Sequence, residues 1–304
     1  MVYLRMARFL SIGNDTLKLD PGSPDSAISY QTDDNGRENS IYLCRVSRVQ
    51  TALRPVAGLL LTLAFWLAGT ATPATAEEDP AYHPSQLAHV GTAGQVIVVT
   101  APSWRSTRAT LRAYERDGNG GWRQVVGATP ARLGWSGLYK AGQRRQGTGK
   151  TPAGTFAIPS AFGRQPNPGT GLPYRQFDRN DAWTYSPRHP RTYNVFQTAR
   201  TSWDSYGTYV ERLWTYGRQY HYVAVLDYNL PAGPIRTGAD GIRRTARPAD
   251  TRAGGGIFLH VTNGKVTAGC IAIPERTMRD VLTWLDPARK PVIVVGPESV
   301  IGRM

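Results

Sequence analysis

Cysteine and lysine are scarce in this sequence of 304 residues. The chain holds two cysteines, Cys44 and Cys270, and its 36 basic residues include lysine only at positions 18, 140, 150, 265 and 290. The formal net charge of +14 therefore comes almost wholly from arginine. Such a charge suits an anionic partner, such as nucleic acid, a membrane surface or an acidic cell-wall polymer. The basic residues stand singly, and helix-turn-helix, zinc-finger and RNP-like patterns are absent from the sequence. We therefore do not expect nucleic acid as a partner.

A hydrophobic run long enough to span a membrane is also missing. The apolar run over 56–69 is shorter than the roughly 20 residues that cross a bilayer. It follows Arg54 and precedes Ala74-Thr75-Ala76, an order typical of a secretory signal peptide with a small-residue cleavage site. We expect cleavage after Ala76 and a secreted, extracytoplasmic protein located at the cell wall. The alternative is an uncleaved signal that anchors the chain, and only then do we expect contact with the membrane.

The signal divides the chain into four parts. Residues 1–48 are polar and lack a periodic pattern, so we expect a non-native leader or a disordered segment, with the true start near Val49. We assign 49–76 to the signal peptide, 77–90 to a linker and 91–300 to one globular domain.

Cleavage at that point leaves Cys270 as the single cysteine of the exported chain, which rules out an intramolecular disulfide. An unpaired thiol in an oxidising compartment is a liability unless it is buried or useful. His260 follows an apolar run ten residues before Cys270, and a nearby imidazole can take the proton of a nucleophilic thiol. Gly269 would let the backbone approach a substrate carbonyl closely. The alternative is a packed structural thiol beside a core histidine.

The pattern of the domain is mostly β with one helix. Met278, Val281, Leu282 and Leu285 recur at helical spacing after Pro274, which predicts one helix behind Cys270. Residues 159–220 are irregular and rich in aromatic side chains, which is typical of a binding loop or lid, or of a disordered insertion. The aromatic content favours an ordered segment. Apolar or alternating runs predict strands over 95–100, 107–115, 122–126, 155–158, 222–228, 257–259 and 291–296.

Two motifs resemble those of the L,D-transpeptidase (YkuD-like) catalytic domain of bacterial cell-wall enzymes. The first is Gly149–Gly154, with the sequence G-K-T-P-A-G, and the second is His260 followed by Gly269-Cys270-Ile271. The resemblance covers roughly 95–297. It implies a mainly β fold, a two-sheet β-sandwich with one helix after the catalytic cysteine. It also implies that Cys270 is the nucleophile and His260 the general base, with Gly269 and the Cys270 amide beside the tetrahedral oxyanion.

The resemblance further implies a cofactor-free reaction on peptidoglycan stem peptides. Cys270 would attack the carbonyl of an L-centre, expel D-alanine, and pass the acyl group to an amine of a neighbouring stem. A wall peptidase or amidase that gives the thioester to water remains open, as does a non-catalytic wall-binding module. We expect no metal, because no second histidine or acidic residue stands at ligand spacing from Cys270.

The motif departs from the family at Ala268 and Ala272, where histidine and arginine are usual, which is typical of a divergent branch. The missing arginine removes a bidentate anchor for carboxylated peptides. A nearby arginine, such as Arg243, Arg244 or Arg247, could supply the charge. As candidate substrate-binding residues we take Lys150, His221, Asp227 and Arg244. Asp227 could orient an imidazole, although a carboxylate near a strand end is also a common turn residue.

Overall fold

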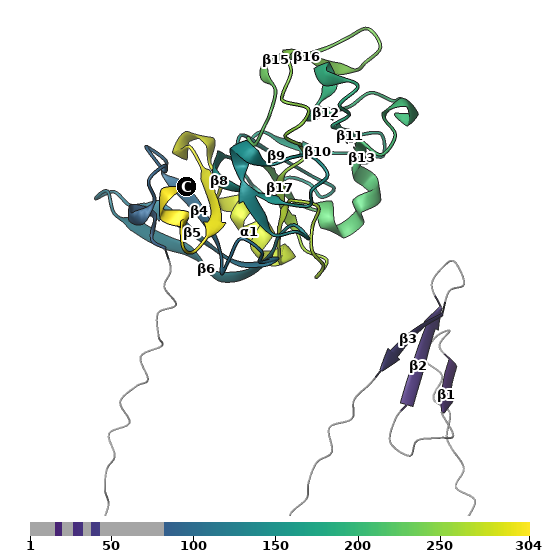
Figure 1. Ribbon diagram of the computed structural model, residues 1–304, viewed down its shortest axis with the longest axis horizontal. Coiled ribbons are helices and arrows are strands. Elements are labelled where there is room, and N and C mark those ends of the chain that lie inside the picture. Colours follow the sequence, from purple (N-terminus) through teal and green to yellow (C-terminus); the bar gives the residue numbers. More distant parts are fainter. Residues whose placement is uncertain (1–15, 20–26, 33–37, 43–81) are drawn as a thin grey trace, which may run out of the picture. The chain divides into compact units, whose positions relative to one another are not determined.

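The computed structural model describes residues 82–304 and, before them, only three strands (Figure 1). The three strands form an antiparallel sheet in the order β1-β2-β3: β1 (Thr16–Leu19), β2 (Ala27–Thr32) and β3 (Glu38–Tyr42). The chain divides into two compact units, 1–73 and 74–304. The predicted signal peptide and its cleavage point lie outside the described residues, and the leader and linker assignments stay predictions. Within the described part, no helix is long and apolar enough to cross a membrane.

An eleven-stranded sheet dominates the second unit, in the order β10-β9-β14-β17-β18-β6-β5-β4-β19-β8-β7. Several strands are rich in valine and isoleucine, whose β-branched side chains suit a pleated, buried surface. The strands are β4 (Gln95–Ala101), β5 (Arg108–Arg116), β6 (Trp122–Arg132), β7 (Leu138–Lys140), β8 (Thr151–Ala157), β9 (Ser160–Gly163), β10 (Tyr174–Gln176), β14 (Val223–Val225), β17 (Phe258–Val261), β18 (Ile271–Ile273) and β19 (Val292–Pro297).

One apolar core joins the two ends of this sheet. Ala161 of β9 and Phe156 of β8, which stand near opposite ends of the strand order, belong to the same buried cluster as Ile97 of β4. The sheet therefore folds over a single core, which gives the facing layers of the predicted sandwich.

The helix α1 (Glu275–Trp284) closes one side of this core. Met278, Val281 and Leu282 are buried because they recur on one face of the helix, as the sequence predicted. It is the one α-helix of the described residues, and it follows Cys270 directly after β18. The prediction of a mainly β fold with one helix behind the cysteine is confirmed. Short 3-10 turns complete the unit: η1 (Pro84–Gln86), η2 (Ala141–Gln143), η3 (Pro190–Thr192), η4 (Asp204–Tyr206), η5 (Leu213–Tyr220), η6 (Pro287–Arg289) and η7 (Ile301–Arg303).

The aromatic-rich segment 159–220 is an ordered part of the unit. After β9 and β10 it forms a small antiparallel sheet of β11 (Ala182–Thr184), β12 (Val195–Gln197) and β13 (Val210–Arg212) in the order β12-β11-β13. The hairpin β15 (Ala232–Thr237) and β16 (Arg243–Arg247) lies on the same side of the unit, away from β4 and β5 (Figure 1). A second apolar cluster packs this segment against the main sheet, and it includes Trp183, Phe258 and Cys270.

Candidate active site

Cys270 stands directly before β18, which pairs in parallel with β17, the strand that carries His260. Leu259 of β17 is in register with Ile271 of β18, and both belong to the main core. Alternation then turns Phe258, His260 and Cys270 to the opposite face, toward the aromatic segment. Continuing the β17–β18 register by one residue places Cys270 across from Phe258, two residues before the level of His260. Both side chains extend into the same cavity.

The residue before Cys270 can only be glycine without strain. Gly269 has φ +142°, and a Cβ atom there would come 2.9 Å from Arg144 Nη2 and 3.0 Å from the Lys150 carbonyl oxygen. Thr267 fixes the loop from the other side, because its hydroxyl donates to the Cys270 carbonyl at 2.7 Å. The Gly269 amide donates to the same hydroxyl at 3.1 Å. Gly269 thus serves the site through close packing, and its amide is engaged by Thr267.

The thiol of Cys270 is buried and protonated at neutral pH. Its Sγ–H donates to the carbonyl oxygen of Gly256 at 3.2 Å. Burial raises the pKa of the Cys270 thiol to about 12, and the carboxylate of Glu211 adds to this effect. A backbone hydrogen bond from Phe258 and the charge of Arg144 oppose it without cancelling it.

The imidazole of His260 is buried and neutral. Burial lowers its pKa to about 4, while hydrogen bonds to the backbone at Val261 and Gln219 act in the opposite direction. Nδ1 lies 2.8 Å from the Val261 carbonyl oxygen, which selects the tautomer with the proton on Nδ1. Nε2 is then the basic nitrogen. The resting site therefore holds a neutral thiol and a neutral base rather than a thiolate and an imidazolium.

A cavity of about 330 Å³ joins these two side chains to the aromatic segment. Cys270, His260 and Thr267 line it from the main sheet and its loop, and Arg144 lines it from the turn after η2. The opposite wall comes from residues 185–220, which contribute Tyr185, Tyr209, Glu211, Tyr216 and Tyr220. The segment that looked irregular in sequence thus supplies one side of the cavity.

Asn194 ties the aromatic segment to the backbone that faces the thiol. Its side-chain oxygen accepts hydrogen bonds from the Gly256 amide and from Trp183 Nε1, both at 2.8 Å. Its amide group donates to the Asn229 carbonyl at 2.7 Å. Asn194 of the aromatic segment therefore holds the backbone of Gly256, the residue whose carbonyl accepts the Cys270 hydrogen bond.

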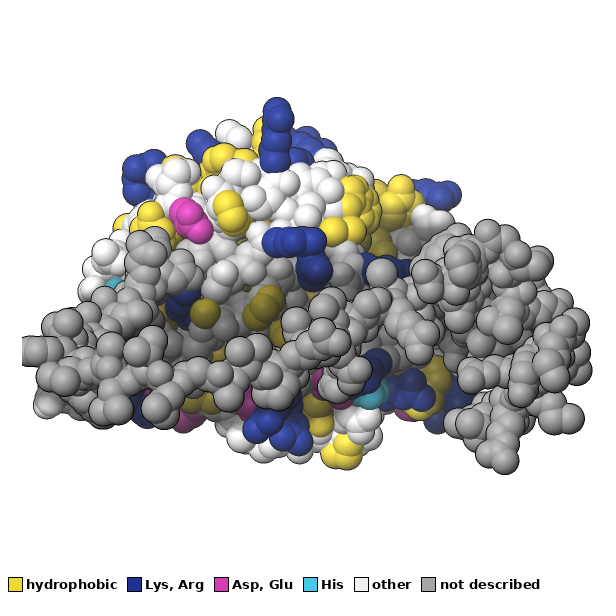
Figure 2. All heavy atoms as spheres, turned by 90° about the horizontal axis from the view of Figure 1, so that it is seen from below, with side chains coloured by type: hydrophobic (Ala, Val, Ile, Leu, Met, Phe, Trp, Pro, Cys, Tyr) yellow, Lys and Arg dark blue, Asp and Glu magenta, His cyan; other side chains and the backbone are white. Residues whose placement is uncertain are grey.

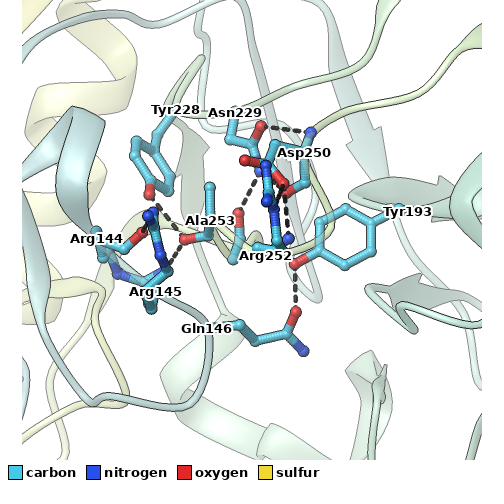
Figure 3. A network of polar contacts seen from close by, with 10 residues as sticks. Arg144, Arg145, Gln146, Tyr193, Tyr228, Asn229, Asp250, Arg252 and Ala253 are labelled. Atoms are coloured by element: carbon cyan, nitrogen blue, oxygen red, sulfur yellow. Dashed lines mark hydrogen bonds and ion pairs between the residues drawn. The ribbon is translucent and has the colours of Figure 1, made fainter.

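Arg144 is the basic residue of the cavity that sequence reasoning missed, as Glu211 is the acidic one. Arg144 is only 4% exposed, and its Nε donates to the Lys150 carbonyl at 2.7 Å. Figure 3 shows Arg144 and Tyr228 directed at one carbonyl oxygen, that of Ala253, each at 2.8 Å. Arg144 stands five residues before Gly149, so the doublet Arg144-Arg145 ahead of the first motif was the available signal.

Two of the four candidate substrate-binding residues have basic side chains held elsewhere. Arg244 pairs with Asp240 at 2.6 Å on the β15–β16 hairpin, away from the lining of the cavity. The Lys150 ammonium donates to the Ser136 carbonyl, and only its backbone is close to the site.

The other two candidates also lie outside the cavity lining. His221 Nδ1 contacts Glu275 Oε1 at 2.7 Å at the start of α1. Asp227 accepts a hydrogen bond from the Ala157 amide at 2.9 Å, so it anchors the end of β8, as the turn interpretation predicted. The structure thus brings together Cys270, His260 and Gly269 and places Lys150, His221, Asp227 and Arg244 around them. No cluster of three or more histidine, cysteine or acidic side chains placed to hold a metal occurs among the described residues.

The fold and this cavity define a β-rich domain with a cysteine and a histidine converging from adjacent strands. The family model of the L,D-transpeptidase catalytic domain, YkuD, matches residues 95–294. The match covers most of the chain and every strand around the cavity, so the chain belongs to the L,D-transpeptidase catalytic domain family. The family resemblance of the two motifs is confirmed. No curated protein matches the chain.

Proposed function

We propose that this protein is an exported cysteine acyltransferase that acts on peptidoglycan stem peptides. The observation that supports this most directly is the convergence of Cys270 and His260 on one cavity in a domain of the L,D-transpeptidase family. His260 lies on β17 and Cys270 directly before the neighbouring strand β18, so regular structure holds both and the backbone need not rearrange to meet a substrate.

The first step is acylation of Cys270. The thiol attacks the carbonyl carbon of an L-centre in the stem peptide while His260 Nε2 takes the thiol proton. The C–N bond to the terminal D-alanine breaks, and the imidazolium returns the proton to the leaving amine. Because both groups are neutral at rest, proton transfer accompanies C–S bond formation instead of preceding it. The hydrogen bonds at Val261 and Gln219 stabilise the imidazolium that forms.

The second step transfers the acyl group to an amine of a neighbouring stem. The tetrahedral oxyanion of each step lies beside the Cys270 amide, at the turn that Thr267 holds. No cofactor takes part in this scheme. An anionic wall polymer is a further partner, because arginine and lysine side chains stand at several separate places on the face that Figure 2 shows. Such a spread favours diffuse attraction to an anionic polymer.

The test is intact-protein mass spectrometry of the full chain incubated with purified stem tetrapeptide. We expect wild type to gain the mass of the stem tripeptide acyl group and to release D-alanine, and Cys270→Ala to gain nothing. If wild type forms no adduct and its thiol reacts with iodoacetamide only after denaturation, Cys270 is a structural thiol. The domain would then be a non-catalytic wall-binding module.

A further inference from the structure

The cavity contains a carboxyl group that the acylation step does not use. Glu211 is the central residue of β13 and lines the cavity together with Cys270 and His260. Its Oε2 accepts a hydrogen bond from the Tyr220 hydroxyl at 2.6 Å. Tyr220 in turn packs edge-on against the His260 ring, with centroids 5.5 Å apart. The carboxyl group is therefore joined to the base of the reaction through one aromatic side chain.

Glu211 has no cation to balance it. In the described part of the chain it forms no ion pair, and its recorded side-chain partner is the neutral Tyr220. Burial raises the pKa of Glu211 to about 7, and the Tyr220 hydrogen bond lowers it by a smaller amount. Glu211 is half-buried, and a carboxylate partly withdrawn from water without a cation is costly, so such a group favours a cationic ligand in the cavity.

Glu211 lies near the thiol, and the neighbouring Arg144 does not pair with it, so a ligand would have to supply the cation. Gly256 lies close to both Glu211 and the thiol. A Cβ atom at Gly256 would lie 3.5 Å from Glu211 Oε1, and the Gly256 carbonyl accepts the hydrogen bond from Cys270 Sγ. Arg144 lies in the same cavity but is held by two carbonyls, and it does not appear among the groups that set the Glu211 pKa. The other ionisable groups that line the cavity with Glu211 are Tyr185, Tyr209, Tyr216, Tyr220, Cys270, His260 and Arg144.

We propose that Glu211 binds the ammonium group of the acceptor amine and takes its first proton, which directs the thioester to aminolysis rather than to hydrolysis. This rests on the proposed function, since it concerns the fate of the Cys270 thioester. It names a primary alkyl ammonium as the acceptor class and Glu211 as a catalytic residue of the second step.

An acyl acceptor that arrives as an ammonium ion must lose two protons, so the site needs two bases. The Glu211 carboxylate takes one proton and leaves a neutral amine with a free electron pair. The amine nitrogen attacks the thioester carbonyl carbon while His260 takes the second proton. The C–S bond then breaks, the imidazolium protonates the Cys270 thiolate, and the acid form of Glu211 gives its proton to solvent. Water as the nucleophile loses only one proton at the attack, so His260 alone is enough for hydrolysis.

The test uses the stem tetrapeptide as both donor and acceptor, because its diamino acid carries a side-chain amine. The ratio of cross-linked dimer to hydrolysed tripeptide measures aminolysis against hydrolysis. We expect Glu211→Gln, which keeps the size and the hydrogen bond to Tyr220, to lower this ratio at least tenfold. Asp204→Asn is the matched control, since Asp204 belongs to the same segment, is 78% exposed and pairs with Arg212 outside the cavity. Thermal unfolding of both variants checks that they fold.

The shape of the pH profile gives a second readout that a structural role would not produce. In wild type, the ratio of dimer to tripeptide should rise as Glu211 ionises up to about pH 7 and should then level, because the acceptor amine is still protonated there. In Glu211→Gln the ratio depends on free amine alone and keeps rising to pH 9. Tyr220→Phe removes the bond that lowers the Glu211 pKa, so its levelling point moves to higher pH.

The outcomes separate the two proposals. An acyl-enzyme that forms normally, with a dimer ratio in Glu211→Gln within twofold of wild type, overturns the role of Glu211 and leaves the proposed function intact. A wild type that forms the acyl-enzyme and yields only tripeptide also overturns the role of Glu211 and identifies a hydrolase. Absence of any acyl-enzyme in wild type overturns both.

Discussion

Replacing Gly269 with alanine tests whether the loop before Cys270 is held as tightly as the structure shows. The backbone at Gly269 has φ +142°, a region that costs a residue with a side chain on the order of 1–3 kcal/mol. The added methyl group would meet Arg144 Nη2 at 2.9 Å and the Lys150 carbonyl at 3.0 Å. Overpacking of this kind costs about 1–3 kcal/mol more, and the stiffer unfolded chain returns about 0.4–1 kcal/mol. We expect Gly269→Ala to lower the free energy of unfolding by roughly 3 kcal/mol.

Urea unfolding followed by tryptophan fluorescence measures this difference, provided that the dependence of the unfolding free energy on urea concentration is the same in both proteins. Gly142→Ala is the matched control, because Gly142 is exposed, lacks a positive φ and would place its Cβ with nothing within 4 Å. We expect this control to unfold within about 0.5 kcal/mol of wild type, as surface substitutions usually do. The reasoning is refuted if Gly269→Ala is as stable as Gly142→Ala.

Two further predictions follow from ionisation. Because burial raises the pKa of Cys270 to about 12, the rate of alkylation of the folded, substrate-free protein should keep rising through pH 10, and levelling near pH 8.5 would show an ordinary thiol. Because burial lowers the pKa of His260 to about 4 from 6.5, the unfolded chain binds more protons between these values. The stabilisation by neutral His260 is therefore fully present above pH 6.5 and is lost as the pH falls toward 4, by up to about 3 kcal/mol. His260→Gln should flatten this part of the curve of stability against pH, measured by urea unfolding. The control His89→Gln, at an exposed histidine, should leave the curve unchanged. Equal slopes in all three proteins would contradict the burial of His260.

The local signals in the sequence predicted those parts of the site that lie on regular elements. The apolar run before His260 forms β17, and the helical spacing of Met278, Val281 and Leu282 forms α1. These patterns are visible because each side chain reports the face it buries. The pairing of β17 with β18 is also foreseeable, since an apolar triplet follows Cys270 directly.

The remainder of the site depends on contacts between distant parts of the chain. Glu211 lies on a strand of three residues, too short to show alternation, and it reaches the thiol only because β13 pairs with β11 in a separate small sheet. Arg144 follows a 3-10 turn and meets carbonyls at positions 150 and 253, which no spacing rule connects. Conversely, Arg244 precedes His260 and Cys270 in the sequence, but Asp240 on the same hairpin holds its side chain.

The neutral state of the Cys270 thiol explains how an unpaired cysteine can persist in an oxidising compartment. Oxidants and stray electrophiles react with the thiolate, so a thiol with pKa about 12 that is 7% exposed reacts slowly with both. In the exported protein that we propose, this protects a cysteine that has no disulfide partner. The same burial makes His260 a weak base, so transfer of the thiol proton to His260 is unfavourable before a substrate binds. Reactivity then depends on a substrate carbonyl beside Cys270, where C–S bond formation offsets the proton transfer. Under the proposed function, such a site would favour a stem peptide over general thiol reagents, and residues 185–220 supply one wall of its cavity.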